Sequence, residues 1–219
     1  MFQAPVLSDT SLHDPIAELR PLVAGLERGP AVDLGFGEGE TLELLGELGY
    51  GPLYGYEIDP DLVDRAQARL DGVGAPARLF TADATSMSEL DDASVQLVVV
   101  INALQYFDLP ALAATVGRVL RSGGHLVGVV PKPRYYVHPR HLLQVRLRRR
   151  PWWLISYPRS ALRSVIFDAT GRLPRLGAAV PEIGWTLRTL RRFAELGGLE
   201  IVEERSTPGD KRALILRRA

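Results

Sequence analysis

Cysteine is absent from this chain of 219 residues, and histidine is rare. Without cysteine the protein cannot form disulfide bonds, Cys-ligated zinc or iron–sulfur sites, or a thiolate nucleophile. The four histidines are scattered along the sequence, at His13, His125, His138 and His141. We therefore expect no metal site and no cysteine-dependent chemistry.

Long apolar stretches are also missing. No uncharged apolar run approaches the ~20 residues that a transmembrane helix needs. Residues 1–10 have no basic start and no long apolar block, so we expect no signal peptide and a cytoplasmic location. The length suits one large α/β domain or two small ones, and the pattern described below favours a single domain over residues 1–219.

Lysine is nearly absent, and the positive charge is unevenly distributed. Lys132 and Lys211 are the only lysines, so arginine supplies almost all of the basic residues. Residues 132–180 contain Lys132, ten arginines and a single acid, Asp168, which gives this segment a net charge of +10. Because the whole chain has a net charge of zero, the remainder carries −10. A basic segment in an acidic protein predicts an anionic partner for that segment.

Strand and helix patterns alternate along most of the chain. Residues 95–101 are nearly all apolar and β-branched, as expected of a central parallel strand that is buried on both faces. The predicted strands are 30–34, 52–58, 77–81, 95–101, 125–130, 199–204 and 212–217, and the predicted helices are 14–27, 40–48, 59–70, 109–120 and 185–196. This order predicts an α/β fold with a doubly wound, mostly parallel sheet of seven strands. The short turn at 208–210 favours an antiparallel last strand.

The clearest local motif is Ala-Val-Asp-Leu-Gly-Phe-Gly-Glu-Gly at residues 31–39. Asp33 stands two positions before the first of three alternating glycines, Gly35, Gly37 and Gly39. The motif falls where an apolar strand becomes a helix, which is where α/β sheets bind nucleotides. Glycines there allow the backbone to approach a ligand closely, although an ordinary tight turn uses them as well.

Two further acids follow predicted strands. Glu57 ends the second strand, 18 residues after Gly39, and a carboxylate at that place can accept hydrogen bonds from both hydroxyls of a ribose. Asp83 follows the third strand and can accept from an exocyclic amino group such as that of adenine. A solvated strand-end acid and a loop cap are the structural alternatives for these two residues.

In this order, the three motifs resemble those of class I S-adenosylmethionine-dependent methyltransferases. Asp33 with the three glycines matches the acid-and-glycine loop of that family, and Glu57 and Asp83 match its ribose and adenine acids. Segments 102–107, 119–126 and 187–201 resemble later parts of the same domain. The resemblance implies a Rossmann-like fold with S-adenosylmethionine as the cofactor. The cofactor-binding residues it implies are Asp33, Gly35, Phe36, Gly37, Gly39, Glu57, Ile58, Asp83, Ala84 and Asn102.

The departures from the family pattern leave the acceptor open. The loop at 102–107 lacks the Asn/Asp-Pro-Pro-Tyr tetrad of methyltransferases that modify amino groups of nucleic acid or protein, and Gln105 stands where many small-molecule members have histidine. We favour a small-molecule acceptor, with RNA methylation as an alternative. An NAD-binding oxidoreductase is disfavoured because Glu40 replaces the last glycine or alanine of the dinucleotide fingerprint.

Several residues are candidates for contact with the acceptor. The expected substrate-binding residues are Gln105, Tyr106, Tyr135, Tyr136, His138 and His141. Of these, Tyr106, His138 and His141 are candidates for a general base, which the reaction needs only if the acceptor atom is protonated at rest. His125 begins a buried strand, and we expect it to be structural.

The basic segment predicts a helical lid inserted between the fifth strand and the last helix, over residues 132–183. It is too long for a plain connection and too short and charged to build its own core. A helix is predicted over 158–168 with Pro158 at its first position. Its spacing groups Leu162, Val165 and Ile166 on one side and puts Arg163 on another.

The lid combines an arginine run at 146–150 with Trp152 and Trp153. A solvated basic face is the simplest interpretation, and a peripheral contact with an anionic membrane is another. A contact with nucleic acid is less favoured, because it does not require the apolar residues 152–155. We expect a hydrophobic or lipid-like acceptor that can carry an anionic part. The sequence predicts no oligomeric state.

Overall fold

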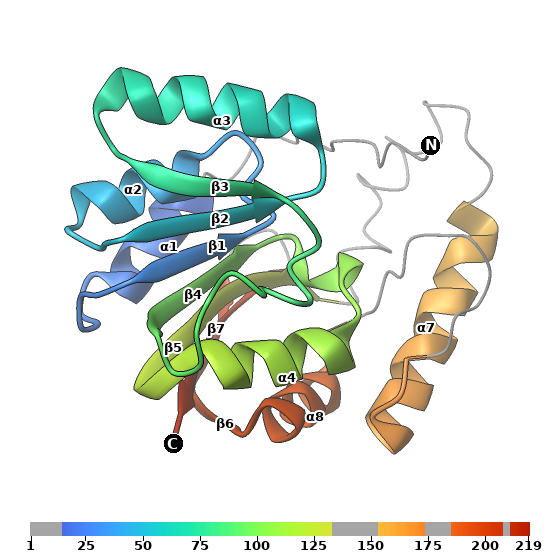
Figure 1. Ribbon diagram of the computed structural model, residues 1–219. Coiled ribbons are helices and arrows are strands. Elements are labelled where there is room, and N and C mark those ends of the chain that lie inside the picture. The colour runs from blue at the N-terminus through green and yellow to red at the C-terminus, as the bar shows by residue number, and fades with distance from the viewer. Residues whose placement is uncertain (1–14, 133–152, 174–184, 208–210) are drawn as a thin grey trace.

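The computed structural model describes residues 15–132, 153–173, 185–207 and 211–219, with only the backbone described for 153–161. Its centre is a seven-stranded sheet in the order β3-β2-β1-β4-β5-β7-β6 (Figure 1). The strands are β1 (Ala31–Leu34), β2 (Leu53–Glu57), β3 (Ala77–Thr81), β4 (Val95–Ile101), β5 (Leu120–Pro131), β6 (Leu199–Thr207) and β7 (Lys211–Arg218). Only β7 runs antiparallel to its neighbours, β5 and β6, which confirms the predicted sheet.

Helices cover both faces of the sheet. On one face lie α1 (Pro15–Val23), α2 (Glu40–Glu47) and α3 (Pro60–Val73), and on the other lie α4 (Leu109–Val119) and α8 (Leu187–Gly197) (Figure 1). Two hydrophobic cores result, one on each face. Along β4, Val98 and Val100 enter one core while Leu97 and Val99 enter the other. This explains why the strand is apolar at almost every position.

Two acids begin helices at the carboxyl edge of the sheet. The Asp59 carboxylate accepts a hydrogen bond from the Asp61 backbone N (3.0 Å), with proline at the first helical position of α3, as the sequence predicted. The Asp108 carboxylate accepts from the Ala111 N (3.3 Å) at the start of α4. Such caps satisfy backbone donors that have no partner within the helix. They fix where the loops after β2 and β4 end.

Two predicted element boundaries were wrong by five residues. β5 begins at Leu120, five residues before the predicted start, because the register with β4 shifts between Val95 and Leu97 and the strand accommodates the extra residues. Gly123 lies there at a φ of +76°, which glycine adopts without strain. The helix of the insert, α7, spans Trp153–Thr170, so Pro158 lies inside it and not at its first position.

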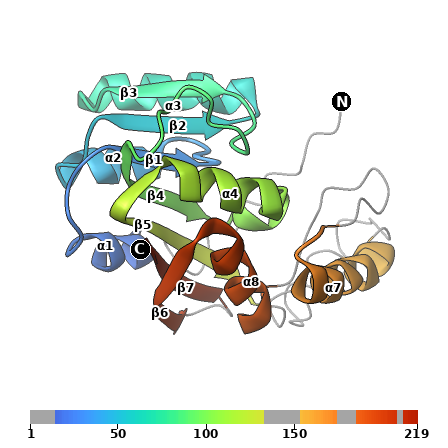
Figure 2. The ribbon, with the colours of Figure 1, turned by 60° about the horizontal axis from the view of Figure 1, so that its bottom comes forward.

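Helix α7 lies beyond the carboxyl ends of the strands and packs against α8 (Figures 1 and 2). Phe167 is fully buried in the core that α4 and α8 share. The Asp168 carboxylate accepts hydrogen bonds from the hydroxyls of Thr186 (3.2 Å) and Thr189 (2.7 Å) at the start of α8. The only acid of the basic segment thus anchors the carboxyl-terminal half of α7. Of the described helices, none is long and apolar enough to cross a membrane.

Candidate functional site

The loops that follow β1 and β4 meet at the carboxyl edge of the sheet. These strands are neighbours at the point where the strand order reverses, which is where open α/β sheets bind ligands. Gly35 lies at a φ of +69°, and a Cβ atom placed on it would lie 2.9 Å from the Cβ of Ala103. Its backbone N donates to the Tyr56 carbonyl oxygen (2.8 Å). Glycine at this position therefore allows close contact among three strand ends.

The rest of the glycine loop presents open backbone. Gly37 lies at a φ of +57°, and no atom lies within 4 Å of the place where a Cβ would stand. Gly39 lies at a φ of +85° and immediately precedes α2. The free backbone N–H groups at the start of a helix favour negative or electron-rich groups. Phe36 differs from its neighbours in the loop, because its ring is buried against Gly55. Only the backbone of Phe36 is therefore available to a ligand.

Glu57 stands beside this open backbone. Its Oε2 accepts from the Gly37 N (3.3 Å), and its Oε1 accepts from the backbone N atoms of Ile58 (2.8 Å) and Asp59 (3.2 Å). A carboxylate has acceptor sites for about four hydrogen bonds. One site therefore remains on Oε2, and the long bond to Gly37 is the easiest to exchange for a ligand hydroxyl. The next side chain, Ile58, is 71% exposed, which is unusual for isoleucine.

Asp33 is buried beneath the same loop. Its side chain is 1% exposed, and its Oδ2 has no hydrogen-bond partner. Burial, and secondly the negative charge of Glu57, raise the pKa of Asp33 to about 8. The Thr41 hydroxyl opposes this rise by hydrogen bonding to the carboxyl group. A buried acceptor without a partner fits a ligand that brings a positive charge or a donor to this loop.

Sequence reasoning missed Thr41, which is 6% exposed on α2. The available signal was a hydroxyl residue in the first turn of a helix, on the side occupied by Leu42 and Leu45. A polar side chain among buried leucines needs a partner, and here the partner is Asp33. The position of Thr41 thus supports the orientation of the Asp33 carboxyl group.

Asp83 lies close in space to Glu57, because the Ala82 backbone N donates to the Glu57 carbonyl oxygen (3.0 Å). The Asp83 Oδ1 accepts from the Thr85 N (2.9 Å), and the side chain is otherwise exposed. Ala84, next to it, is buried at 1% exposure. The Asp83 carboxylate thus both caps its own loop and faces solvent beside the end of β2.

The loop after β4 closes the site on its other side. Asn102 lies at a φ of +53°, and its backbone N donates to the Val129 carbonyl oxygen (2.8 Å). Gln105 is buried, with its Nε2 donating to the Asn102 carbonyl oxygen (2.6 Å) and its Oε1 lacking a partner. Tyr106 is 41% exposed at the end of the short helix η1 (Leu104–Tyr106). Two of the expected acceptor residues therefore lie beside the glycine loop.

Among the histidines considered for the acceptor side, the structure describes only His125. Tyr135, Tyr136, His138 and His141 lie outside the described residues. In the sheet His125 pairs with Leu97 of β4, and Leu97 pairs with Ala31, the first residue of β1. His125 is therefore remote from the carboxyl edge of the sheet. Burial, and secondly the charge of Arg217, lower its pKa, so His125 is held neutral within the sheet.

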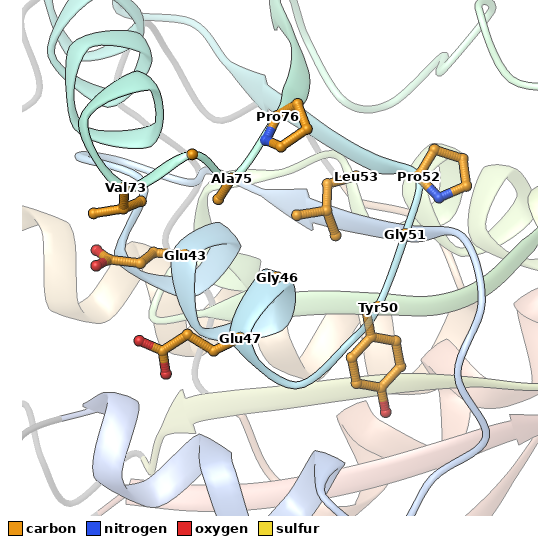
Figure 3. Close-up of a pocket in the computed structure, with 11 residues that line it drawn as sticks. Glu43, Gly46, Glu47, Tyr50, Gly51, Pro52, Leu53, Val73, Ala75 and Pro76 are labelled. Carbon is orange, nitrogen blue, oxygen red and sulfur yellow. The ribbon is translucent and has the colours of Figure 1, made fainter.

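A cavity of about 480 Å³ lies elsewhere in the molecule (Figure 3). It is lined by the end of α2, the start of β2 and the residues after α3, so it opens at the amino-terminal ends of the strands. Glu43 and Glu47 at its rim already pair with Arg69 (2.7 Å) and Arg20 (2.7 Å). The cavity is therefore distinct from the carboxyl-edge site.

Comparisons with known proteins agree with this geometry. Residues 32–128 match the family model described as a methyltransferase domain. No curated protein matches the sequence. Among solved structures, the chain is similar to the PH0226 protein from Pyrococcus horikoshii OT3, with 17% identity, a TM-score of 0.67, and coverage of 93% of this chain and 89% of the other.

Two further structures are similar to this chain. A SAM-dependent methyltransferase from Aquifex aeolicus is 14% identical, with a TM-score of 0.62 and coverage of 95% of this chain and 91% of the other. Geranyl diphosphate C-methyltransferase from Streptomyces coelicolor A3(2) is 14% identical, with a TM-score of 0.64 and coverage of 93% and 78%. Residues 32–128 are thus similar to methyltransferase domains, and the chain has the fold of the solved S-adenosylmethionine-dependent methyltransferase from Aquifex aeolicus.

Proposed function

We propose that this protein transfers a methyl group from S-adenosylmethionine to a small, hydrophobic or lipid-like acceptor. The observation that carries the proposal is the placement of three acids at successive strand ends. Asp33 lies near the end of β1, Glu57 ends β2 and Asp83 follows β3, and the open backbone of Gly37 lies beside Glu57. This arrangement fits a ligand with one cationic end, a hydroxylated sugar and an aromatic amine.

Each acid has a distinct role in the proposed cofactor site. The remaining acceptor site on the Glu57 Oε2 would hold a ribose hydroxyl, and the free Oδ2 of Asp83 would accept from the adenine amino group. The exposed Ile58 side chain would cover the apolar face of the adenine ring. The unpartnered Oδ2 of Asp33 would receive a donor or cationic group of the amino acid portion.

The cofactor supplies a methyl group that its cationic sulfonium has already activated, so the protein mainly positions the acceptor. Positioning in near-attack geometry is worth ~7–11 kcal/mol. The loops after β1 and β4 are in contact at Gly35 and Ala103, which gives a fixed boundary between the two substrates. Tyr106 on that boundary is half-exposed and could orient an acceptor or take its proton.

We also propose that residues 132–183 form the lid over the acceptor, with His138 and His141 as candidate contacts. The position of α7 beyond the carboxyl ends of the strands supports this role (Figure 2). Closing such a site excludes water, which strengthens the electrostatic contacts inside it. The similar methyltransferase from Streptomyces coelicolor A3(2) is named for a small molecule, geranyl diphosphate, which supports a small acceptor here.

Glu57→Gln tests the cofactor site. The substitution keeps the size of the side chain but weakens a charged acceptor, so S-adenosylhomocysteine affinity measured by calorimetry should fall. A hydrogen bond to a charged group contributes ~1.5–3 kcal/mol, which corresponds to a loss of about 10–150-fold. Glu47→Gln, at the opposite edge of the sheet, is the matched control and should bind like the wild type.

An unchanged affinity in Glu57→Gln would contradict the assignment of Glu57 to the ribose. Failure of the wild-type protein to bind either S-adenosylmethionine or S-adenosylhomocysteine would contradict the proposed function as a whole. Tight binding of NAD in place of these ligands would favour the oxidoreductase alternative.

A further inference from the structure

Among the side chains of α7 that the structure describes, two apolar residues point outward and two polar residues are buried. Leu162 and Val165 are 51% and 65% exposed, whereas Arg163 and Ser164 are both 6% exposed. A surface helix of a globular protein normally buries the apolar stripe and exposes arginine. Phe167 and Asp168 hold the helix in this orientation through the core and through the α8 hydroxyls.

Within the described residues, Arg163 has no charged partner close enough to neutralise it. Its Nε is buried without a hydrogen-bond partner, and within the described part of the chain no carboxylate lies within the 4.0 Å of an ion pair. Asp108 is the carboxylate whose charge reaches it, and that carboxylate already caps α4. Burial lowers the pKa of the Arg163 guanidinium, and Asp108 opposes this effect without being the larger influence.

The position of Arg163 relates it to the acceptor side of the site. Asp108 ends the loop that contains Asn102, Gln105 and Tyr106. α7 lies beyond the carboxyl ends of the strands in both views (Figures 1 and 2). Because the charge of Asp108 reaches Arg163, the guanidinium is close to the end of the loop after β4.

A buried arginine without a partner is costly, because arginine is almost never buried unless it is paired. Arg163 lies one turn before Phe167 on the same face of α7, so the packing that buries Phe167 also buries Arg163. An anion from outside this chain would complete the pair that the described residues leave open. The guanidinium fork matches carboxylate and phosphate oxygens, to which it donates two parallel hydrogen bonds.

We infer that Arg163 binds a carboxylate or phosphate group of the methyl acceptor. This inference rests on the proposed function, and it narrows the acceptor to an amphiphile whose anionic group lies at α7. The acceptor atom would lie on the part of the molecule directed towards Tyr106 and the glycine loop. Discrimination against neutral analogues follows, because a neutral ligand would leave the guanidinium buried and unpaired.

The experiment compares four probes by calorimetry on the full-length protein loaded with S-adenosylhomocysteine. The probes are octanoate, octyl phosphate, octanol and inorganic phosphate. The wild type should bind octanoate or octyl phosphate at least 10-fold more tightly than octanol. Binding of octyl phosphate without octanoate would identify a phosphate group, and the reverse would identify a carboxylate. Inorganic phosphate shows whether the apolar chain is needed.

Arg163→Met should remove the preference for the anionic probes while S-adenosylhomocysteine affinity stays unchanged. Arg172→Met is the matched control, since Arg172 is exposed just after α7, and it should retain the preference. If Arg163→Met does not fold, Arg163→Lys is tested in its place. Lysine keeps the positive charge but cannot donate two parallel hydrogen bonds, so the affinity for the anionic probes should fall several-fold.

Equal affinity of the wild type for octanol and both anionic probes would overturn the inference, as would an anion preference that survives the Arg163 substitution. Both results are compatible with normal cofactor binding, so they leave the proposed function standing. If the wild type does not bind S-adenosylhomocysteine at all, the proposed function itself is overturned.

Discussion

Two acids at the carboxyl edge share one environment but differ in burial. Glu57 is partly exposed and accepts three backbone hydrogen bonds, whereas Asp33 is buried with an unpartnered oxygen. Two neighbouring carboxylates cannot both ionise freely when one of them is desolvated. The proton therefore stays on Asp33, whose pKa is about 8, and this has a measurable effect on stability.

Asp33→Asn should change how stability depends on pH. In the unfolded chain an aspartate loses its proton near pH 3.9, whereas in the folded protein Asp33 keeps it up to about pH 8. Between these values the folded state binds more protons, so the free energy of unfolding contributed by Asp33 falls as pH rises. Asparagine does not ionise and avoids this loss. The melting temperature of the variant relative to the wild type should thus rise from pH 5 to pH 9.

The control for this measurement is Asp83→Asn, the same exchange at an exposed position. If the difference in melting temperature between Asp33→Asn and the wild type does not change with pH, Asp33 is already ionised in the folded protein. A difference that grows equally for Asp83→Asn would point to net charge as the cause.

The carboxyl-edge positions of Asp33, Glu57 and Asp83 could be predicted from the sequence, because each lies near or directly after the end of a strand and backbone topology alone brings it to the edge. Thr41 and the inward orientation of Arg163 could not be predicted. The partner of Thr41 is eight residues away and buried, and the orientation of α7 depends on Phe167 and Asp168 contacting distant helices. Local patterns contain no information about such tertiary contacts.

At the scale of the elements, α4 and α8 pack together through glycines. A Cβ atom added to Gly117 of α4 would lie 2.2 Å from the carbonyl oxygen of Gly197, the last residue of α8. Backbone atoms of two helices cannot separate without moving the core that both helices cover. Gly72 of α3, by contrast, has no atom within 4 Å of its Cβ position.

Gly117→Ala should therefore destabilise the protein by about 1–3 kcal/mol through overpacking. Gly72→Ala should stabilise it by ~0.5–1 kcal/mol, because alanine loses less conformational freedom than glycine in a helix. Urea unfolding followed by circular dichroism measures both changes. If both substitutions stabilise the protein, helix propensity alone determines the change in stability, and the α4–α8 contact accommodates an added methyl group.

Element boundaries show why periodicity predicted the sheet better than the insert. Strands such as β4 are short and apolar, and helices such as α3 begin with a side-chain cap, so each of these signals is local. The start of α7 was placed at Pro158 because proline favours the first helical turn, yet the helix extends five residues further towards the amino terminus. The residues from Trp153 onward continue the helix, and Pro158 lies within it.

At the scale of the whole molecule, the positive charge is concentrated in the part of the sequence that contains α7. The segment 132–180 carries +10, and α7 within it exposes Leu162 and Val165. Apolar side chains within a basic surface are typical of proteins that contact anionic lipid. A lipid-like acceptor would be reached from such a surface.

We expect the wild type to bind vesicles of phosphatidylserine and phosphatidylcholine at ~0.15 M salt, where exposed charges are screened beyond ~8 Å. Leu162→Asp/Val165→Asp should weaken this binding in a flotation assay, because it removes the apolar contact and adds negative charge. Val73→Asp/Val202→Asp changes two valines that are 52% and 53% exposed on other elements, and it is the matched control.

A mixed RNA pool distinguishes the remaining alternative. Tight RNA binding that persists in Leu162→Asp/Val165→Asp, without vesicle binding, would contradict the lipid interpretation and favour RNA methylation. Binding to neither would mean that the acceptor is reached from solution, and the outer face of α7 would then need another explanation.

The position of β7 in the sheet has a consequence for how the chain folds during synthesis. β7 lies between β5 and β6 although it follows both in the sequence. Until residue 218 has emerged from the ribosome, β5 has one unpaired edge and β6 has no partner in the sheet. β6 and β7 can pair with each other within microseconds and then dock on β5 as a unit. Before that step, the nearly complete domain exposes a long strand edge on β5, and neighbouring nascent chains can pair with it.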